Sequence, residues 1–148
     1  MKKDENKVTK TKISKSGGEI AEEGGEQAFE QLSASMQKTL WICKLLSDKK
    51  ANGIVYIDVE SKTSLCDYFV ICSGKSTTQV KALAENLDEK MELNYGFTPR
   101  RKEGLREGRW AVLDYEDVIV HIFNDEARDF YHLERLWEDG KNLTKYED

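Results

Sequence analysis

Apolar residues recur at helical spacing in two early parts of the chain, and each recurrence predicts a helix. The first helix is expected from Ser35 to about Asn52, where the following Gly53 suits a left-handed cap. The second is expected from Ser76 to Gly96. Ser76 and Gln79 have the spacing of a capping box, in which two side chains satisfy backbone groups at the start of a helix.

Short β-branched and aromatic runs predict strands between and after these helices. Residues 53–59 and 67–73 read as buried strands, and residues 97–102 as an edge strand because Pro99 cannot donate to a sheet ladder. Residues 110–114 and 117–123 are expected to form a hairpin joined at Tyr115-Glu116. A last helix is predicted from about Asp125 to Glu138, followed by Gly140 as its cap. Its expected apolar face comprises Phe130, Leu133, Leu136 and Trp137.

The predicted order is helix, two strands, helix, three strands, helix. This order indicates an α/β (α+β) fold, with a mixed β-sheet of about five strands flanked by helices. The helix after the second strand permits a crossover connection, so part of the sheet can be parallel.

The first 34 residues differ from the rest in composition. They are rich in Lys, Glu, Gly and Ser and contain few large apolar side chains, so they cannot bury enough surface to offset the entropy of ordering. We therefore expect residues 1–34 to be a disordered charged extension and residues 35–148 to form one domain. A basic arm that touches RNA is the functional alternative to a solvated extension, which is favoured.

Alternation along the predicted hairpin separates two faces. With Asp114 opposite Asp117, Val112 would face Ile119 and Trp110 would face His121, with Phe123 on the same side. The other side is purely aliphatic and suits a core beneath helices. It consists of Ala111, Leu113, Val118, Val120 and Ile122. The mixed aromatic side fits either a docking face with Asp114 and Tyr115 at its rim, or a sheet packed on both sides.

Charge and composition narrow the classes of function. The formal net charge of -5 argues against the basic field of most nucleic-acid-binding proteins but allows a basic protein partner. No apolar stretch approaches the roughly 18 residues of a membrane span, and no secretory signal is evident. The three cysteines form no Cys-x-x-Cys pair. A cytoplasmic protein with reduced cysteines is expected.

Catalytic patterns are weak throughout the sequence. The run Gly74-Lys75-Ser76 resembles the end of a phosphate-binding loop, but Phe69 stands where the first glycine of that motif belongs. Asp58, Asp67 and Asp114 lack the paired spacing that metal-dependent phosphoryl transfer needs. Neither His121 nor His132 has a neighbour at metal-ligand spacing. We therefore predict no enzyme activity, no catalytic residues, no metal site and no cofactor.

From about Ser35 to Gly140 the chain resembles the Iojap family, also called the ribosomal silencing factors. The matching stretches are Asp58-Val59, residues 64–74 (SLCDYFVICSG) with Ser76 and Gln79, Glu103-Gly104, Trp110, residues 113–115 (LDY), residues 117–123 (DVIVHIF) and residues 128–137 (RDFYHLERLW). Two features depart from the family pattern. Glu116 stands where the hairpin usually has glycine, which puts the turn type in question, and residues 1–34 lie outside the match.

The resemblance implies a nucleotidyltransferase-like outline without the catalytic residues of those enzymes. It also implies binding to the large ribosomal subunit through ribosomal protein uL-fourteen, which blocks association with the small subunit and represses translation, and a homodimer off the ribosome. It favours the docking interpretation of the hairpin. The predicted partner-binding residues are then Trp110, Val112, Asp114, Tyr115, Ile119, His121 and Phe123. The alternative is a nucleotidyltransferase-like enzyme or a nucleotide-binding module.

Overall fold

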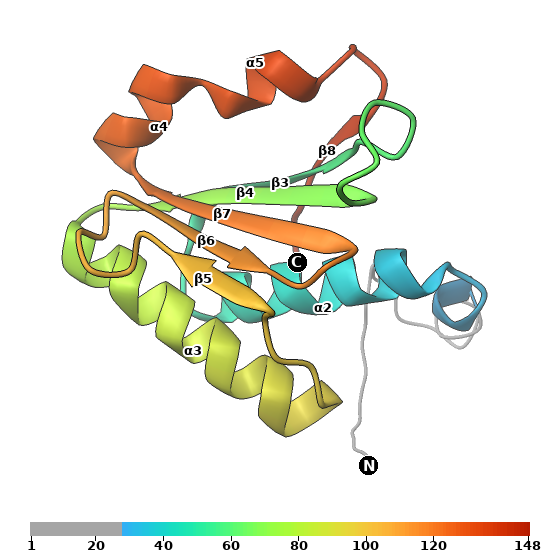
Figure 1. Cartoon of the computed structure of the whole chain (residues 1–148), viewed down its shortest axis with the longest axis horizontal. Helices are drawn as coiled ribbons and strands as arrows, with labels where there is room; N and C mark the ends of the chain where they lie inside the picture. The colour runs from blue at the N-terminus through green and yellow to red at the C-terminus, as the bar shows by residue number, and fades with distance from the viewer. Residues whose placement is uncertain (1–27) are drawn as a thin grey trace.

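A mixed six-stranded sheet forms the centre of the computed structural model, which describes residues 28–148 (Figure 1). Its strand order is β5-β6-β7-β4-β3-β8. Only β4 and β7 run parallel; the other neighbouring pairs are antiparallel. The strands are β3 (Asn52–Asp58), β4 (Tyr68–Gly74), β5 (Arg101–Glu103), β6 (Trp110–Asp114), β7 (Val118–Asn124) and β8 (Leu143–Lys145).

Helices cover both faces of this sheet. Figure 1 shows α2 (Ala34–Asp48) and α3 (Thr77–Tyr95) on one side, and α4 (Asp125–Tyr131) and α5 (Leu133–Trp137) on the other. The larger core lies under α2 and α3, and it contains the whole aliphatic set that alternation assigns to that face. These five side chains are all fully buried: Ala111, Leu113, Val118, Val120 and Ile122. The α+β fold class and the three-layer arrangement are thus confirmed.

Local signals predicted the ends of α3 well. The Ser76 side chain accepts a hydrogen bond from the Gln79 backbone N–H at 3.1 Å, and Gly96 ends the helix with φ 77°. The return bond of the capping box is shifted by one residue, because Gln79 Oε1 accepts from the Lys75 N–H at 2.7 Å. The first helix likewise begins at a serine cap, where the Ser33 hydroxyl accepts from the Met36 N–H.

The predicted register of the β6–β7 hairpin was wrong by two residues. Trp110 lies opposite Phe123, Val112 opposite His121 and Asp114 opposite Ile119. The connection has three residues, 115–117, and Glu116 adopts φ 82°. A slip of two positions preserves the alternation of side chains, so the predicted division into two faces holds although the pairs changed.

The C-terminal part differs most from the prediction. The single helix expected from 125 to 138 is broken at His132, which adopts a left-handed conformation with φ 49°. Helix α5 ends at Trp137 with Glu138 as its cap, so Gly140 lies in the following loop rather than at the helix end. The chain then adds β8 beside β3, a sixth strand that the sequence did not suggest.

Three further boundaries changed. Helix α2 ends at Asp48 with Lys49 as its cap, so Gly53 lies in β3 and does not cap the helix as predicted. Pro99 precedes the short strand β5, which begins at Arg101 and is an edge strand as expected. The predicted extension lies largely outside the described residues, which begin at Ala28. Residues 28–30 are helical, and the Phe29 ring lies 5.8 Å from that of Trp41 on α2, so contacts with the domain begin before Ser35.

Candidate partner-binding surface

Strands β6 and β7 bring the predicted docking residues onto one face, and α4 and α5 cover part of it. Phe123 is fully buried, and His121 is only 8% exposed. Trp110, Val112 and Ile119 are half-buried. Packing on both sides of the sheet is thus observed at His121 and Phe123, while a docking role for Trp110, Val112 and Ile119 stays a prediction. The buried pair belongs to β7, and the partly exposed Trp110 and Val112 lie opposite it on β6, with Ile119 nearer the turn.

Trp110 is held at the border between these two parts. Its ring lies 4.8 Å from Phe123 and 4.9 Å from Tyr131 of α4. Its indole Nε1 donates a hydrogen bond to His121 Nδ1 at 3.0 Å. A half-buried tryptophan with its ring and its polar atom both fixed is typical of the rigid aromatic anchors found at protein interfaces.

His121 acts as the acceptor in this pair, which defines its protonation. Because Nδ1 accepts from Trp110, the neutral ring carries its proton on Nε2. Among the described residues Nε2 has no hydrogen-bond partner, and the ring meets Phe69 edge-on at 5.0 Å. Burial lowers the pKa of His121 to about 4, so the ring is uncharged at neutral pH.

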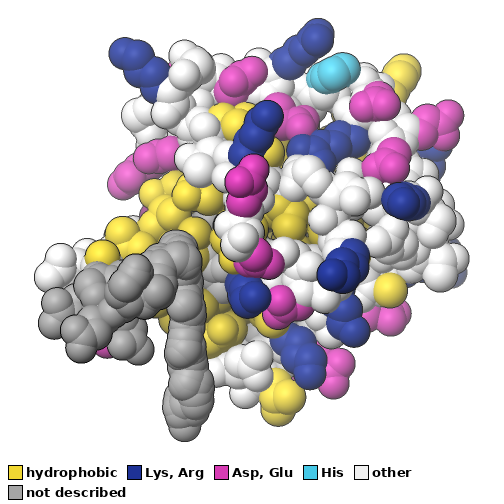
Figure 2. Space-filling view, turned by 180° about the vertical axis from the view of Figure 1, so that it is seen from behind, with side chains coloured by type: hydrophobic (Ala, Val, Ile, Leu, Met, Phe, Trp, Pro, Cys, Tyr) yellow, Lys and Arg dark blue, Asp and Glu magenta, His cyan; other side chains and the backbone are white. Residues whose placement is uncertain are grey.

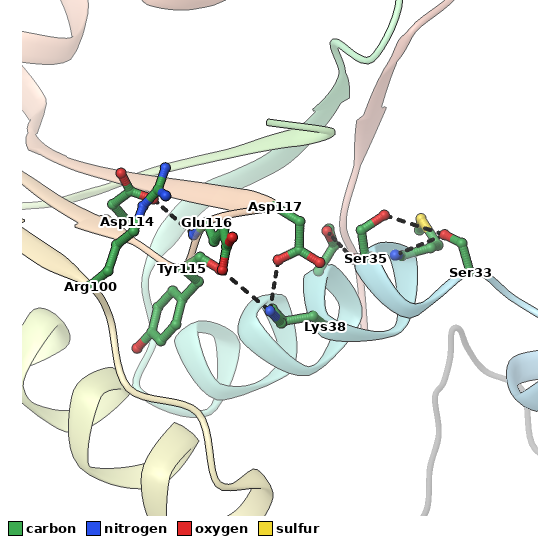
Figure 3. A network of polar contacts seen from close by, with 10 residues as sticks. Ser33, Ser35, Lys38, Arg100, Asp114, Tyr115, Glu116 and Asp117 are labelled. Carbon is green, nitrogen blue, oxygen red and sulfur yellow. Dashed lines mark hydrogen bonds and ion pairs between the residues drawn. The ribbon is translucent and has the colours of Figure 1, made fainter. Parts of the chain in front are cut away.

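The tip of the hairpin is fixed from two sides, as Figure 3 shows. On the α2 side, the Lys38 ammonium donates to Asp117 Oδ1 at 2.7 Å and to the Tyr115 carbonyl at 3.4 Å. The same ammonium lies 4.2 Å from the centre of the Phe97 ring. Lys38 is itself buried, so the turn is tied to α2 by a poorly solvated charge.

On its other side, the carboxylate of Asp114 bridges the turn to the strand edge. Asp114 Oδ1 accepts from the Glu116 N–H at 2.8 Å and lies 3.2 Å from Arg100 Nε. These contacts hold Glu116 in its positive-φ conformation with its side chain exposed. The acidic group presented to solvent at the tip is therefore Glu116, while the Asp114 carboxylate is mostly buried in the turn.

Tyr115 does not lie at the rim of the docking face, where it was predicted. Its side chain points to the other side of the sheet, is 3% exposed and packs in the core beneath α2 and α3. Burial, followed by the charge of Asp88, raises the pKa of its hydroxyl. The alternation of side chains along β6 predicted the face of Asp114 correctly. By the same alternation, the next residue, Tyr115, points to the opposite face.

Helices α4 and α5 contribute exposed apolar side chains that helical periodicity assigns to the core. Phe130 and Leu136 are each 75% exposed and Tyr131 is 45% exposed, while only Leu133 of the predicted face is buried. Periodicity could not reveal this, because it assumes an uninterrupted helix through His132.

Two of the three acidic residues weighed for metal-dependent chemistry, Asp58 and Asp114, serve local roles. Asp58 Oδ1 accepts from the Glu60 N–H at 3.1 Å, and Asp114 holds the hairpin turn. Within residues 28–148 no group of three His, Cys, Asp or Glu side chains is arranged to hold a metal ion. Over the same range, no helix combines the length and apolarity that crossing a membrane requires.

One protein family matches most of this sequence. The family described as "Ribosomal silencing factor during starvation" matches residues 33–148. The ribosomal silencing factor RsfS of Bacillus subtilis is 40% identical over 93 residues, covering 63% of this chain and 78% of that protein. RsfS of Zymomonas mobilis is 41% identical over 95 residues, covering 64% and 71%. The mouse protein named "Mitochondrial assembly of ribosomal large subunit protein 1" is 33% identical over 98 residues, covering 65% and 43%.

Solved structures agree with this match. A crystal structure from Chromobacterium violaceum superposes with a TM-score of 0.65 at 31% identity, covering 72% of this chain and 90% of that one. A second, from Bacillus halodurans, gives 0.63 at 33% identity, covering 74% and 99%. The matched residues include both sides of the sheet and the whole β6–β7 hairpin, and the chain belongs to the ribosomal silencing factor family.

Proposed function

We propose that this protein binds the large ribosomal subunit through ribosomal protein uL-fourteen and prevents the small subunit from joining, so that translation is repressed. The domain would act by occupying space on the joining face rather than by chemistry. The main observation in support is the half-buried apolar face formed by Trp110, Val112 and Ile119. The hairpin that presents this face is fixed at its tip.

A rigid apolar face of this kind supports protein recognition. The hydrogen bond to His121 and the packing on Phe123 hold the Trp110 ring in place before a partner arrives. Binding then loses little side-chain entropy, which is the main cost that pre-organisation removes. A partner would desolvate the exposed edge of the indole and the neighbouring aliphatic side chains, as at interface hot spots.

The charges at this surface support a basic protein as partner rather than nucleic acid. Glu116 is exposed at the hairpin tip, and the whole chain carries a formal net charge of -5. Figure 2 shows the molecule from behind the view of Figure 1. On that side, Lys and Arg side chains are interspersed with Asp and Glu instead of forming one basic area. Acidic groups at the edge of an apolar face speed encounter with a basic partner and align it.

Sedimentation of purified ribosomal subunits tests the proposal directly. Small and large subunits are mixed under associating conditions with increasing protein, and the assembled ribosome is measured on a gradient. We expect assembled ribosomes to disappear as the protein co-sediments with the large subunit. Normal subunit association at saturating protein would overturn the proposed function.

Two tryptophan variants test the contribution of a single residue to binding. Trp110→Ala should weaken large-subunit binding by roughly 2 kcal/mol or more, the usual loss for a hot-spot aromatic. Trp41→Ala is the matched control, because Trp41 is also half-buried but stacks on Tyr95 at 4.2 Å, on the α2–α3 side of the sheet. Thermal unfolding of both variants separates loss of binding from loss of folding, and light scattering measures the homodimer expected off the ribosome.

A further inference from the structure

The break in the last helix turns large apolar side chains outward. His132 takes φ 49°, which ends α4 and starts α5 in a new direction. Leu133 remains buried against the sheet, whereas Phe130 and Leu136 are each 75% exposed. A non-glycine residue in this conformation is unfavourable, so the break must be held by surrounding contacts.

Arg128 supplies those contacts. Its Nε and Nη2 atoms lie 2.9 Å and 2.7 Å from Glu134 Oε2, which joins α4 to α5 across the break. Its Nη1 donates to the Asn52 carbonyl at 3.2 Å, which ties the pair to the start of β3. The next residue, Gly53, has φ 55°, and a Cβ atom there would lie 2.9 Å from Arg128 Nη1. The outward position of Phe130 and Leu136 is thus built into the fold rather than being a frayed helix end.

Two of the exposed side chains, Tyr131 and Phe130, continue the candidate docking face. Tyr131 is 45% exposed and its ring lies 4.9 Å from Trp110, at the border of that face. Phe130 meets Tyr131 edge-on at 5.0 Å. An unbroken series of aromatic contacts therefore runs from β6 onto α4. We call Phe130, Tyr131 and Leu136 the α4–α5 apolar surface.

Acidic side chains surround this surface. Residues 125–138 contain five carboxylates and two arginines, and the Arg128–Glu134 pair neutralises one of each. The four remaining carboxylates are exposed: Asp125, Glu126, Asp129 and Glu138. Arg135 is the single remaining arginine of this segment. Such a surface complements a basic partner, whereas a symmetric contact with a second copy would set like charges against each other.

We propose that the α4–α5 apolar surface is a second half of the docking site, occupied by a basic protein surface of the large ribosomal subunit. The inference rests on the proposed function and extends it. The hairpin face and the α4–α5 apolar surface contact the partner together, joined at Trp110 and Tyr131. The Arg128–Glu134 pair positions the second half without touching the partner through its own charges.

The test uses the full chain and purified large subunits. Phe130→Ser with Leu136→Ser should weaken binding by about tenfold or more, because two exposed apolar contacts are lost. Leu93→Ser is the matched control, since Leu93 is 70% exposed but lies on α3, on the opposite layer. Both proteins should melt like the unchanged chain, because all three replaced side chains are mainly in solvent.

A variant with fewer acidic side chains tests independently whether the partner is basic. Glu126→Gln with Asp129→Asn should weaken binding at low salt and flatten its dependence on salt concentration, as expected when acidic groups face a basic partner. Equal binding by the Phe130/Leu136 double variant and the unchanged chain would overturn the inference while leaving the proposed function intact. If the same double variant loses a homodimer but binds large subunits unchanged, the surface contacts a second copy of the chain and the inference is also overturned. If the unchanged chain fails to bind large subunits, the proposed function itself has failed.

Discussion

Trp110 Nε1 donates to His121 Nδ1 at 3.0 Å, along a diagonal of the β6–β7 pair rather than between directly opposed residues. The bond joins a half-exposed indole to a buried, uncharged imidazole. Protonation of Nδ1 would replace the acceptor by a donor and remove the bond. The orientation of the main aromatic anchor therefore depends on His121 remaining neutral.

This dependence predicts an acid-sensitive stability. The pKa of His121 is about 4 in the folded protein and near 6.5 when unfolded. As pH falls from 6.5 toward 4, the unfolded state takes up a proton that the folded state excludes, so the free energy of unfolding decreases. The loss is at most about 1.4 kcal/mol per pH unit and roughly 3 kcal/mol in total. His121→Asn keeps an acceptor near the position of Nδ1 but has no titrating ring. Its free energy of unfolding should therefore lack this dependence on pH.

Urea unfolding between pH 7 and pH 4.5 measures the effect. The stability difference between the unchanged chain and His121→Asn should shrink as pH falls. His132→Asn is the control, since His132 is exposed and asparagine tolerates its left-handed backbone. A constant difference across this pH range for His121→Asn would contradict the assignment of His121 as a buried neutral acceptor.

Lys38 should be far more important for stability than an exposed lysine in a similar ion pair. Lys38→Met keeps most of the apolar stem but removes the ammonium donor of the Asp117 carboxylate. The Tyr115 carbonyl then keeps only its bond from the Asp117 N–H. We expect a loss of roughly 2 kcal/mol, since the Lys38 and Asp117 side chains are 10% and 31% exposed. Lys44→Met breaks the Lys44–Asp48 pair, whose side chains are 54% and 50% exposed, and should cost less than about 0.5 kcal/mol.

Chemical denaturation of the two lysine variants gives the comparison. Binding to large subunits adds a second measurement, because a turn released from α2 should also present the docking face less well. Equal losses of stability for Lys38→Met and Lys44→Met would show that the buried pair does not hold the hairpin.

Glu116→Gly should stabilise the fold. Glu116 has φ 82°, where glycine is free of the Cβ clash that other residues suffer. The expected gain is about 1 kcal/mol, partly offset by the greater freedom of glycine in the unfolded chain. Glu116→Ala should not give this gain, because it removes the charge and keeps the strain.

Thermal unfolding distinguishes these contributions. Glu85→Gly is the opposite control, because Glu85 is exposed within α3, where glycine costs about 1 kcal/mol. A stability gain from Glu116→Ala as large as that from Glu116→Gly would assign the effect to the charge of Glu116 instead of its backbone. Loss of large-subunit binding in both variants would further show that the exposed carboxylate contacts the partner.

The sequence by itself determined the features that depend on short-range rules. Ser76 and Gly96 delimit α3 because capping needs only neighbouring backbone groups. The two faces of β6 and β7 followed from alternation, which a register slip of two residues leaves unchanged. The shared face of Trp110, Val112 and Ile119 is therefore a property of the sequence pattern alone.

Tertiary structure alone decided which parts of that face are covered and what lies beside it. Whether Phe123 is buried depends on where α4 and α5 pack, and their path depends on Arg128 reaching the Asn52 carbonyl, 76 residues away in sequence. Likewise β8 exists because β3 offers an edge to which it can pair. Periodicity describes each segment separately, whereas burial, helix breaks and strand pairing depend on contacts between segments that are distant along the chain.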